Sequence, residues 1–497
     1  MPDPPSELMN RVASVQTNIR NTLKMTCDLR DQDWSRWFDQ SLSRGVYQGN
    51  EVEGLIDGEE TFRSMIEAIR TTGSETGGEE SYFIYMLNWY VDLDFNLVPG
   101  INLITLLSSQ YRRNVQIRAM FWDQVGTQNN RGVEQISNLK NGAAILDNNT
   151  LNLGAHHQKI LIVKGQEGLI AFCGGVDPNP DRIASVNQQS GSPMHDVHCR
   201  IKGPAARELL TIFCNRWTDH PRSLNIDNKK GALIGLAEPT PAATGDKYVQ
   251  IGCTFGNGSR HAGITSRNGN RWYSFAQNGE TTARSIIFHA IREATSFIYI
   301  EDQYLISMEA SSCLQAQLPK IKRLIILIPH SSISDLPRVW TLRRNFIDNL
   351  MSAPDSSGKV AICYRIDSNQ RGDTRTVPPR SQHTYIHAKI FVIDDKFAII
   401  GSANCNNRGY THDSEVVAGI FDESSNNEPK IHFAHELRLR LWAEHLNRKK
   451  AEVFDPIASS CHWFSPPSDA HIALYDPRAG TDSWTAAGIN QIDPIGE

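Results

Sequence analysis

HAKIFVIDDKFAIIGSAN (residues 387–404) and its earlier counterpart HQKILIVKGQEGLIAFCGGVD (residues 157–177) are the two stretches that decide the fold. Each begins with a His-x-Lys triplet, continues through an apolar run, and reaches a turn of small residues. One such triplet would carry little weight, but two with the same downstream context indicate a duplicated half-site. The duplication predicts that two imidazoles and two ammonium groups come together, namely those of His157, Lys159, His387 and Lys389.

The repeat extends well beyond the two triplets. Each copy is preceded by a helical pattern with acidic residues near its start, then by a first apolar strand and a second apolar strand. The matching segments are 58–70 and 279–292 for the helices, 82–87 and 297–300 for the first strands, and 115–120 and 324–328 for the second strands. Each copy ends in a closing helix that carries a tryptophan and a histidine.

Strands that alternate with helices predict a layered α/β architecture. We expect two α/β halves related by a pseudo-twofold axis, each a mixed β-sheet flanked by helices, with the active site at the interface between the halves. Prolines and glycines break the periodicity between residues 221 and 250. The boundary is therefore expected between an N-terminal half, residues 1–235, and a C-terminal half, residues 236–497.

Within each half the His-x-Lys stretch is predicted to form a β-hairpin. Side chains at positions i and i+2 of a strand share one face, so a strand over 387–394 would present the imidazole and the ammonium side by side. A turn at 394–396 would bring the small residues back beside the pair, where they leave room for a phosphate. The Asn404 amide could donate to a phosphate oxygen. The first half is expected to repeat this hairpin with its turn around Lys164.

These residue types suit the cleavage of a phosphodiester. The reaction needs a nucleophile, an acid for the leaving alcohol, and positive charge for the phosphoryl oxygens. Two histidines and two lysines supply all three, so neither a metal nor another cofactor is expected. Each histidine also needs a carboxylate that fixes its tautomer. Asp196 and Glu415 occupy matching places, each about 30 to 40 residues after its own histidine and at the start of an apolar strand.

This set of motifs resembles the phospholipase D superfamily, whose hallmark is a duplicated His-x-Lys-x4-Asp motif. The second copy matches it in full, from His387 to Asp394, whereas the first copy carries Lys164 at the Asp position. IYIEDQY at 298–304 is similar to a signature of the phospholipid-cleaving members, and GGVD at 174–177 is similar to a form found in their first half. The resemblance covers roughly residues 55–447.

The resemblance implies roles for individual residues. His157 would be the nucleophile and His387 the acid, although the symmetry of the site makes either imidazole suitable for either role. Asp196 and Glu415 would orient the two histidines. The residues expected to contact substrate are Trp89, Asp177 and Gln303. Further histidines that flank these motifs are expected to pack behind them, namely His156, His195, His383 and His412.

The function implied by the resemblance is that of a phospholipase D. Such an enzyme hydrolyses glycerophospholipids, phosphatidylcholine or similar, to phosphatidic acid and free headgroup through a phosphohistidine, and transfers the phosphatidyl group to alcohols. A nuclease or another phosphodiesterase of the same superfamily is the alternative. The net charge of −5 weighs against a nucleic-acid partner, because nucleic-acid-binding proteins usually carry a basic excess. The expected partner is therefore phospholipid at a membrane or micelle surface.

The sequence also bears on the cellular setting. No apolar run approaches the ~18 residues of a membrane span. The N-terminus lacks the basic and apolar segments of a secretory signal. We therefore expect a monomer with no transmembrane segment and with peripheral contact to membranes. Its location is expected to be either cytoplasmic or, after export by a non-classical route, that of a secreted effector.

Overall fold

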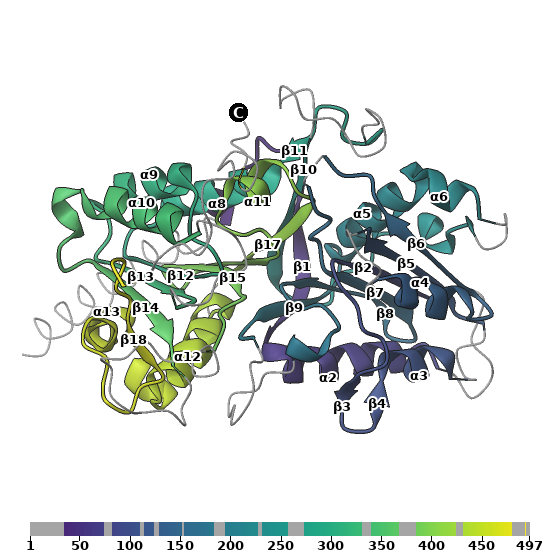
Figure 1. Cartoon of the computed structure of the whole chain (residues 1–497), viewed down its shortest axis with the longest axis horizontal. Coiled ribbons are helices and arrows are strands. Elements are labelled where there is room, and N and C mark those ends of the chain that lie inside the picture. The colour runs from purple at the N-terminus through teal and green to yellow at the C-terminus, as the bar shows by residue number, and fades with distance from the viewer. Residues whose placement is uncertain are drawn as a thin grey trace, which may run out of the picture.

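The computed structural model of the chain describes residues 34–73, 82–109, 114–123, 129–151, 154–182, 194–226, 231–256, 273–330, 339–366, 384–423, 431–479 and 493. These residues form one mixed sheet of sixteen strands with helices on both faces (Figure 1), beside a small two-stranded sheet. The α/β class predicted from the sequence is therefore confirmed. Within the described residues, no helix is both long enough and apolar enough to cross a membrane.

The large sheet contains the same seven-strand order twice. From the centre outward, the N-terminal half runs β1 (Val46–Ile56), β9 (Val197–Lys202), β8 (Gly168–Gly174), β7 (Ile160–Gly165), β2 (Phe83–Asn88), β5 (Gln116–Trp122) and β6 (Gly142–Asp147). The C-terminal half runs β10 (Lys247–Phe255), β17 (Glu415–Asp422), β16 (Phe397–Gly401), β15 (Lys389–Ile393), β12 (Phe297–Asp302), β13 (Arg323–Ile328) and β14 (Val360–Arg365).

The two halves join through antiparallel pairing of β1 with β10, so the sheet continues from one half into the other. In each half the three outer strands are parallel to one another and the inner strands are antiparallel. Short additions complete the sheet: β18 (Ile472–Leu474) pairs with β14, and β11 (Glu280–Thr281) pairs with β10. The separate two-stranded sheet consists of β3 (Asn96–Val98) and β4 (Ile101–Asn102).

Helices cover both faces of each half (Figure 1). Those of the N-terminal half are α2 (Asp57–Arg70), α3 (Leu103–Ser108), α4 (Asn130–Ser137), α5 (Ala206–Asp219) and α6 (Pro221–Leu224). Those of the C-terminal half are α8 (Thr282–Glu293), α9 (Met308–Gln317), α10 (Val339–Met351), α11 (Asn407–Thr411), α12 (Phe433–Leu446), α13 (Pro456–Ser459) and α14 (Cys461–Phe464). The predicted repeat therefore appears as α2 with α8 and as the closing helices α5 with α12.

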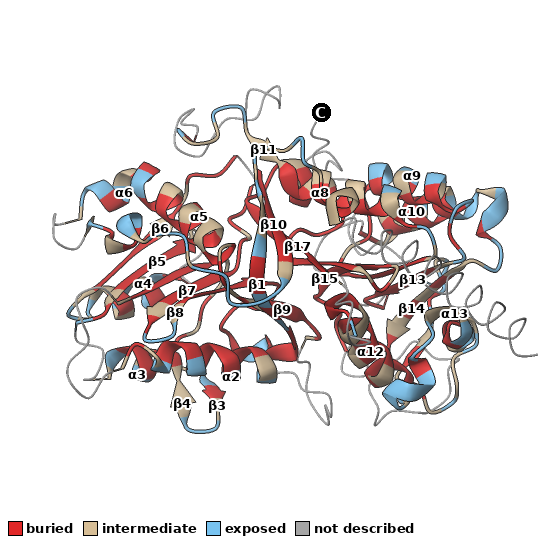
Figure 2. Cartoon of the chain, turned by 180° about the vertical axis from the view of Figure 1, so that it is seen from behind, coloured by how far each residue is buried: buried red, intermediate tan, exposed pale blue. Residues whose placement is uncertain are grey.

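Burial explains why the strands are apolar along their whole length. Strands β2, β12 and β17 are buried at every position, because helices cover the sheet on both faces (Figure 2). One hydrophobic core packs both closing helices against the sheet, with Trp217 from α5 and Trp442 from α12 each about 1% exposed or less. Two further cores lie under α2 and under α8 to α10.

The structure corrects several details of the expected repeat. The seven-strand order shared by the halves has two strands more than expected, the central strand (β1 or β10) and the outermost parallel strand (β6 or β14). The strand expected over 387–394 begins only at Lys389, so the imidazole of the triplet lies in the segment before the strand. Lys164 lies within β7, opposite Phe83 and Leu169, and not at the hairpin turn.

Asp394 does occupy the turn of the second hairpin, with a φ of 54°. Its carboxylate accepts from the backbone N–H groups of Thr295, Ser296 and Phe297 at 2.7 to 2.8 Å. This carboxylate therefore ties the hairpin to the start of β12. The first half holds this end of its hairpin differently, through an ion pair between Lys164 and Glu238.

Candidate active site

The two His-x-Lys triplets meet at the seam between the halves. His157 lies just before β7, and its backbone N–H donates to the Ser414 carbonyl at 2.9 Å. His387 lies just before β15, and its backbone N–H donates to the His195 carbonyl at 2.7 Å. Each triplet is therefore hydrogen-bonded to a segment of the opposite half. The two imidazole ring centroids lie 6.4 Å apart.

The two carboxylates pair with the histidines across this seam. Asp196 Oδ2 lies 2.6 Å from Nδ1 of His387. Both carboxylate oxygens of Glu415 lie 3.0 Å from Nδ1 of His157. The pairing expected from the sequence, in which each carboxylate serves the histidine of its own half, is wrong. Because each triplet docks on the opposite half, the carboxylate that it meets belongs to that half.

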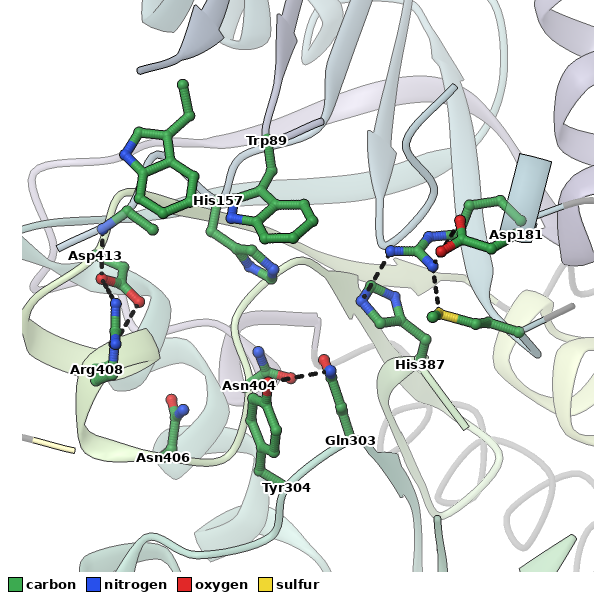
Figure 3. A pocket seen from close by; sticks show the side chains of 14 residues that line it. Trp89, His157, Asp181, Gln303, Tyr304, His387, Asn404, Asn406, Arg408 and Asp413 are labelled. Carbon is green, nitrogen blue, oxygen red and sulfur yellow. Dashed lines mark hydrogen bonds and ion pairs between the residues drawn. The ribbon is translucent and has the colours of Figure 1, made fainter. Parts of the chain in front are cut away.

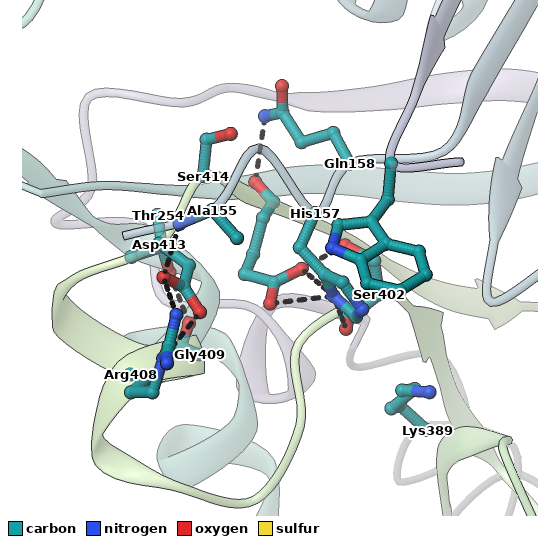
Figure 4. Close-up of polar contacts among 12 residues, drawn as sticks. Ala155, His157, Gln158, Thr254, Lys389, Ser402, Arg408, Gly409, Asp413 and Ser414 are labelled. Atoms are coloured by element: carbon teal, nitrogen blue, oxygen red, sulfur yellow. Dashed lines mark hydrogen bonds and ion pairs between the residues drawn. The ribbon is translucent and has the colours of Figure 1, made fainter. Parts of the chain in front are cut away.

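The tautomer of each imidazole follows from these contacts. Nδ1 of His157 also lies 3.1 Å from the Ser402 carbonyl, which can only accept, so this nitrogen carries a hydrogen (Figure 4). Burial and the ammonium groups of Lys159 and Lys389 hold the pKa of His157 well below its ordinary value. A neutral imidazole that donates from Nδ1 keeps its lone pair on Nε2. His157 therefore presents a nucleophilic nitrogen.

The small residues that follow each triplet make room for the carboxylates. A Cβ placed on Gly175 would overlap the carboxylate of Asp196, so a larger residue there would displace it. In the second half, the corresponding Ser402 hydroxyl donates to Glu415. From the sequence, these turns were expected to leave room for a phosphate. In the structure they hold the two carboxylates that orient the imidazoles.

The two lysines are buried beneath the imidazoles. Lys159 Nζ donates to the carbonyl of His157 at 2.9 Å, and Lys389 Nζ donates in the same way to the carbonyl of His387. Burial lowers the pKa of both ammonium groups, that of Lys389 to about 7. Each lysine is therefore held at its own histidine by the backbone of its triplet.

Asp177 lies beneath the site. Its side chain is fully buried and forms an ion pair of 3.1 Å with Lys159. It also accepts from the backbone N–H of Trp89 at 3.1 Å. Asp177 is not part of the cavity wall described next. The substrate contact expected for this residue is therefore replaced by a role in positioning Lys159 and Trp89.

A cavity of about 470 Å³ opens over the two imidazoles (Figure 3). Its wall is formed by Trp89, Trp122, Ala155, His157, Asp181, Arg182, Met194, Gln303, Tyr304, His387, Asn404, Asn406, Arg408 and Asp413. Both halves contribute to this wall, so the cavity lies at the seam. The structure therefore brings Trp89, Gln303 and Asn404 to the cavity, as the sequence predicted.

Two parts of the cavity wall differ in character. The rings of Trp89 and Trp122 are stacked with centroids 5.9 Å apart, and Trp89 stands edge-on to His157. This part offers an apolar face. The side-chain amide of Gln303 donates to the hydroxyl of Tyr385 at 2.8 Å, which fixes a polar group on the other side.

Sequence reasoning missed two arginines in the wall. Arg408 forms a bidentate pair with Asp413 at 3.0 and 3.1 Å (Figure 4). Arg182 lies in a short 3-10 helix (Pro180–Arg182) and reaches His387. Both residues follow the small-residue turns within a few positions, so their spacing from those turns was the available signal.

A buried ionic network lies behind the second triplet. The imidazole of His195 bridges Asp57 at 2.8 Å and Glu301 at 2.9 Å, and Glu301 also contacts His445 at 3.0 Å. Despite their burial, the carboxylates hold the pKa of His195 well above its ordinary value. The groups His195, Glu301 and His445, and likewise Asp57, His195 and Glu444, are spaced closely enough to surround a metal ion. In the structure His195 pairs with Asp57 and Glu301, and Glu301 also pairs with His445, whereas Glu444 pairs with Arg365.

The remaining flanking histidines lie outside the cavity wall or outside the described residues. His156 is buried and contacts Asp147 and Ser414, and His412 is also buried. His383 lies outside the described residues. The burial of His156 and His412 agrees with the expectation that they pack behind the site.

Comparisons with known proteins agree with this geometry. The family model described as Phospholipase D matches residues 179–330 and 356–472, a range that contains His387 and both carboxylates and begins after His157. Phospholipase D alpha 2 of Oryza sativa subsp. japonica is 24% identical over 422 residues, which cover 62% of this chain and 50% of that protein. Phospholipase D alpha 1 of Ricinus communis is 23% identical over 529 residues, which cover 76% and 64%.

The chain thus spans between half and two thirds of the length of these plant relatives. Among solved structures, the phosphatidylserine synthase of Haemophilus influenzae Rd KW20 matches with a TM-score of 0.51 and 13% identity. The match covers 85% of this chain and 87% of the synthase. At that identity the likeness shows a shared fold.

Proposed function

The chain belongs to the phospholipase D family, and from that premise we propose that it hydrolyses glycerophospholipids, phosphatidylcholine or similar, to phosphatidic acid and free headgroup. One observation carries the proposal. Two imidazoles from opposite halves face one cavity with centroids 6.4 Å apart, and a carboxylate holds Nδ1 of each. Because both rings line one cavity, a phosphoryl group within it can contact both imidazoles, whose reacting nitrogens must approach their target atoms to about 3 to 3.5 Å.

In the first step, Nε2 of His157 attacks phosphorus, and the bond from phosphorus to the headgroup oxygen breaks. His387, protonated on Nε2, gives its proton to that oxygen as the alcohol leaves. The product is a phosphatidyl group bonded to His157. Burial and neighbouring cations disfavour the protonated form of His387, and the negative charge of the bound diester favours it.

In the second step, Nε2 of His387 removes a proton from water, and the resulting hydroxide attacks phosphorus. The phosphorus–nitrogen bond breaks, its electron pair returns to His157, and phosphatidic acid is released. Buried ammonium groups at Lys159 and Lys389 stabilise the negative charge that develops on the phosphoryl oxygens. An alcohol in place of water gives a phosphatidyl ester by the same route.

The test is product analysis with mixed micelles of phospholipid in the presence of ethanol. We expect both phosphatidic acid and phosphatidylethanol. Formation of phosphatidic acid without any ethyl ester would contradict the phosphohistidine route. His157→Ala and His387→Ala should each abolish turnover, whereas His462→Ala, which changes a histidine in α14 outside the cavity wall, should not. Degradation of plasmid DNA with no release of headgroup would favour the nuclease alternative.

We also propose that the protein acts as a monomer at a membrane surface, since every group of the site comes from one chain. Size-exclusion chromatography coupled to light scattering tests the oligomeric state. The effector role is tested by directing the protein to the periplasm of a bacterial host. Growth arrest that depends on His387 supports that role, and unchanged growth supports lipid turnover within the producing cell.

A further inference from the structure

The cavity wall contains one buried arginine side chain, that of Arg182, and the proposed mechanism gives it no role. Its side chain is 3% exposed and lies beside His387, with Nη2 3.4 Å from Nε2 of the imidazole. Nε2 is the nitrogen that must exchange a proton with the substrate, because Asp196 holds Nδ1. Any phosphoryl group that Nε2 of His387 serves therefore lies within reach of this guanidinium.

The guanidinium of Arg182 has unused hydrogen-bonding capacity. Its Nε is buried and, among the described residues, has no hydrogen-bond acceptor. Nη1 forms an ion pair of 3.1 Å with Asp181, whose side chain is 48% exposed, so solvent screens this pair. Nη1 also contacts the sulfur of Met194, and the bond from Nη2 to His387 is long. A buried guanidinium with an unpartnered Nε at a cavity wall is suited to an anion.

The other arginine of the wall provides a contrast. Arg408 is held in a bidentate pair by Asp413, whose side chain is more buried than that of Arg408 itself. The charge of Arg408 is therefore matched locally. Among the described residues, no buried carboxylate forms an ion pair with Arg182. The charge of Arg182 does act on the buried Asp196, but that carboxylate is hydrogen-bonded to His387, so the guanidinium can still bond to a ligand.

We propose that Arg182 binds a non-bridging oxygen of the substrate phosphodiester and is a further catalytic residue. This inference rests on the proposed function for the identity of the diester. In the structure Nη2 lies 3.4 Å from Nε2 of His387. A phosphate oxygen is a charged and therefore stronger acceptor than a neutral imidazole. Binding of the diester thus draws the guanidinium away from Nε2 and leaves that nitrogen free for proton transfer.

The charge of Arg182 also links binding of the diester to the protonation of His387. After burial, the charge of Arg182 is the largest cause that lowers the pKa of His387. A phosphate that neutralises this guanidinium raises the pKa of His387, so the acid is charged only when substrate is present. Removing the guanidinium should also raise this pKa in the free enzyme. The alkaline limb of kcat/KM, which reports the acid in the free enzyme, should then move to higher pH.

The experiment titrates inorganic phosphate into the full chain by calorimetry, which does not depend on which diester the enzyme cleaves. In Arg182→Gln we expect the Kd for phosphate to rise by about tenfold or more, since a charge-assisted hydrogen bond is lost. Arg182→Lys should retain part of the affinity. Arg63→Gln removes an exposed arginine of α2 and should bind phosphate as the unaltered protein does. Thermal unfolding verifies that each variant is folded.

A second set of measurements distinguishes the phosphate from the headgroup. The kcat/KM of Arg182→Gln should fall by a similar factor on phosphatidylcholine, phosphatidylethanolamine and phosphatidylserine, with its alkaline limb moved upward. A loss confined to phosphatidylserine would assign Arg182 to the headgroup carboxylate and overturn the proposal. Unchanged phosphate affinity in Arg182→Gln would also overturn it. If the protein cleaves no phospholipid, the proposed function fails, but the phosphate titration still decides the role of Arg182.

Discussion

Replacing Asp196 by Asn tests the crossed pairing of carboxylates and histidines. The Asp196 carboxylate lies 2.6 Å from Nδ1 of His387, and both groups are buried. A hydrogen bond to a charged, buried partner contributes about 1.5 to 3 kcal/mol. In Ser-His-Asp enzymes the equivalent Asp-to-Asn change also stabilises the wrong tautomer and lowers kcat about 10⁴-fold. We therefore expect kcat/KM of Asp196→Asn on a phospholipid to fall about 10²- to 10⁴-fold, or about 3 to 5.5 kcal/mol.

The choice of substrate makes this prediction specific. An alkyl headgroup is a poor leaving group and needs a proton from the acid, whereas p-nitrophenolate leaves without one. If Asp196 orients the acid His387, then Asp196→Asn should lower kcat/KM strongly on a phospholipid and at most about tenfold on a p-nitrophenyl phosphodiester. Glu415→Gln, which affects the nucleophile His157, should lower kcat/KM on both substrates.

The assay is headgroup release for the phospholipid and nitrophenolate absorbance for the activated diester. The comparison uses kcat/KM because this constant includes only the steps up to formation of the phosphohistidine, so the later activation of water by His387 does not enter. Equal losses of Asp196→Asn on the two substrates would refute the reasoning. They would mean that Asp196 serves the nucleophile.

Three further predictions concern the groups around the site. His195→Gln leaves two buried carboxylates without their shared cation, and we expect the free energy of unfolding in urea to fall by about 3 to 5 kcal/mol. Because the pKa of His195 is raised in the folded protein, its stabilising contribution is full below pH ~6.5 and is lost as the pH rises through the folded pKa. The difference in the free energy of unfolding between the variant and the unaltered protein should therefore narrow at alkaline pH. A difference that widens there would contradict a raised pKa of His195 in the folded protein. Asp394→Ala removes the acceptor of three backbone N–H groups, and should lower stability by about 1 to 3 kcal/mol in the same assay while kcat/KM stays close to that of the unaltered protein. Gly175→Ala should displace the Asp196 carboxylate and reproduce the substrate pattern of Asp196→Asn, and equal losses on both diesters would show that the glycine acts in another way.

Local patterns account for most of the fold. The helices α2 and α8 and the strands β2, β5, β12 and β13 lie close to the predicted segments, because their apolar spacing is a local property. The expected acidic first turn is present in α2 and absent from α8. Strand β6 has the sequence GAAILD, which is short and half composed of Gly and Ala, so it lacks a strand signature. Strand β1 contains two glycines and two glutamates along its length. Its central place in the sheet comes from pairing with β9 and β10 and is invisible in its own pattern.

The sequence by itself determined the duplication, the pair of imidazoles with their lysines, and the chemistry to which these groups are suited. Only the tertiary structure decided which groups meet. The partners of His387 and His157 lie 191 and 258 residues away, and both halves carry the same motif order, so spacing alone cannot distinguish pairing within a half from pairing across the seam. Because each triplet docks on the opposite half, each histidine pairs with the carboxylate of that half. The same packing turns Asp177 toward Lys159, away from the cavity, and brings Arg182 to the nitrogen that must exchange a proton.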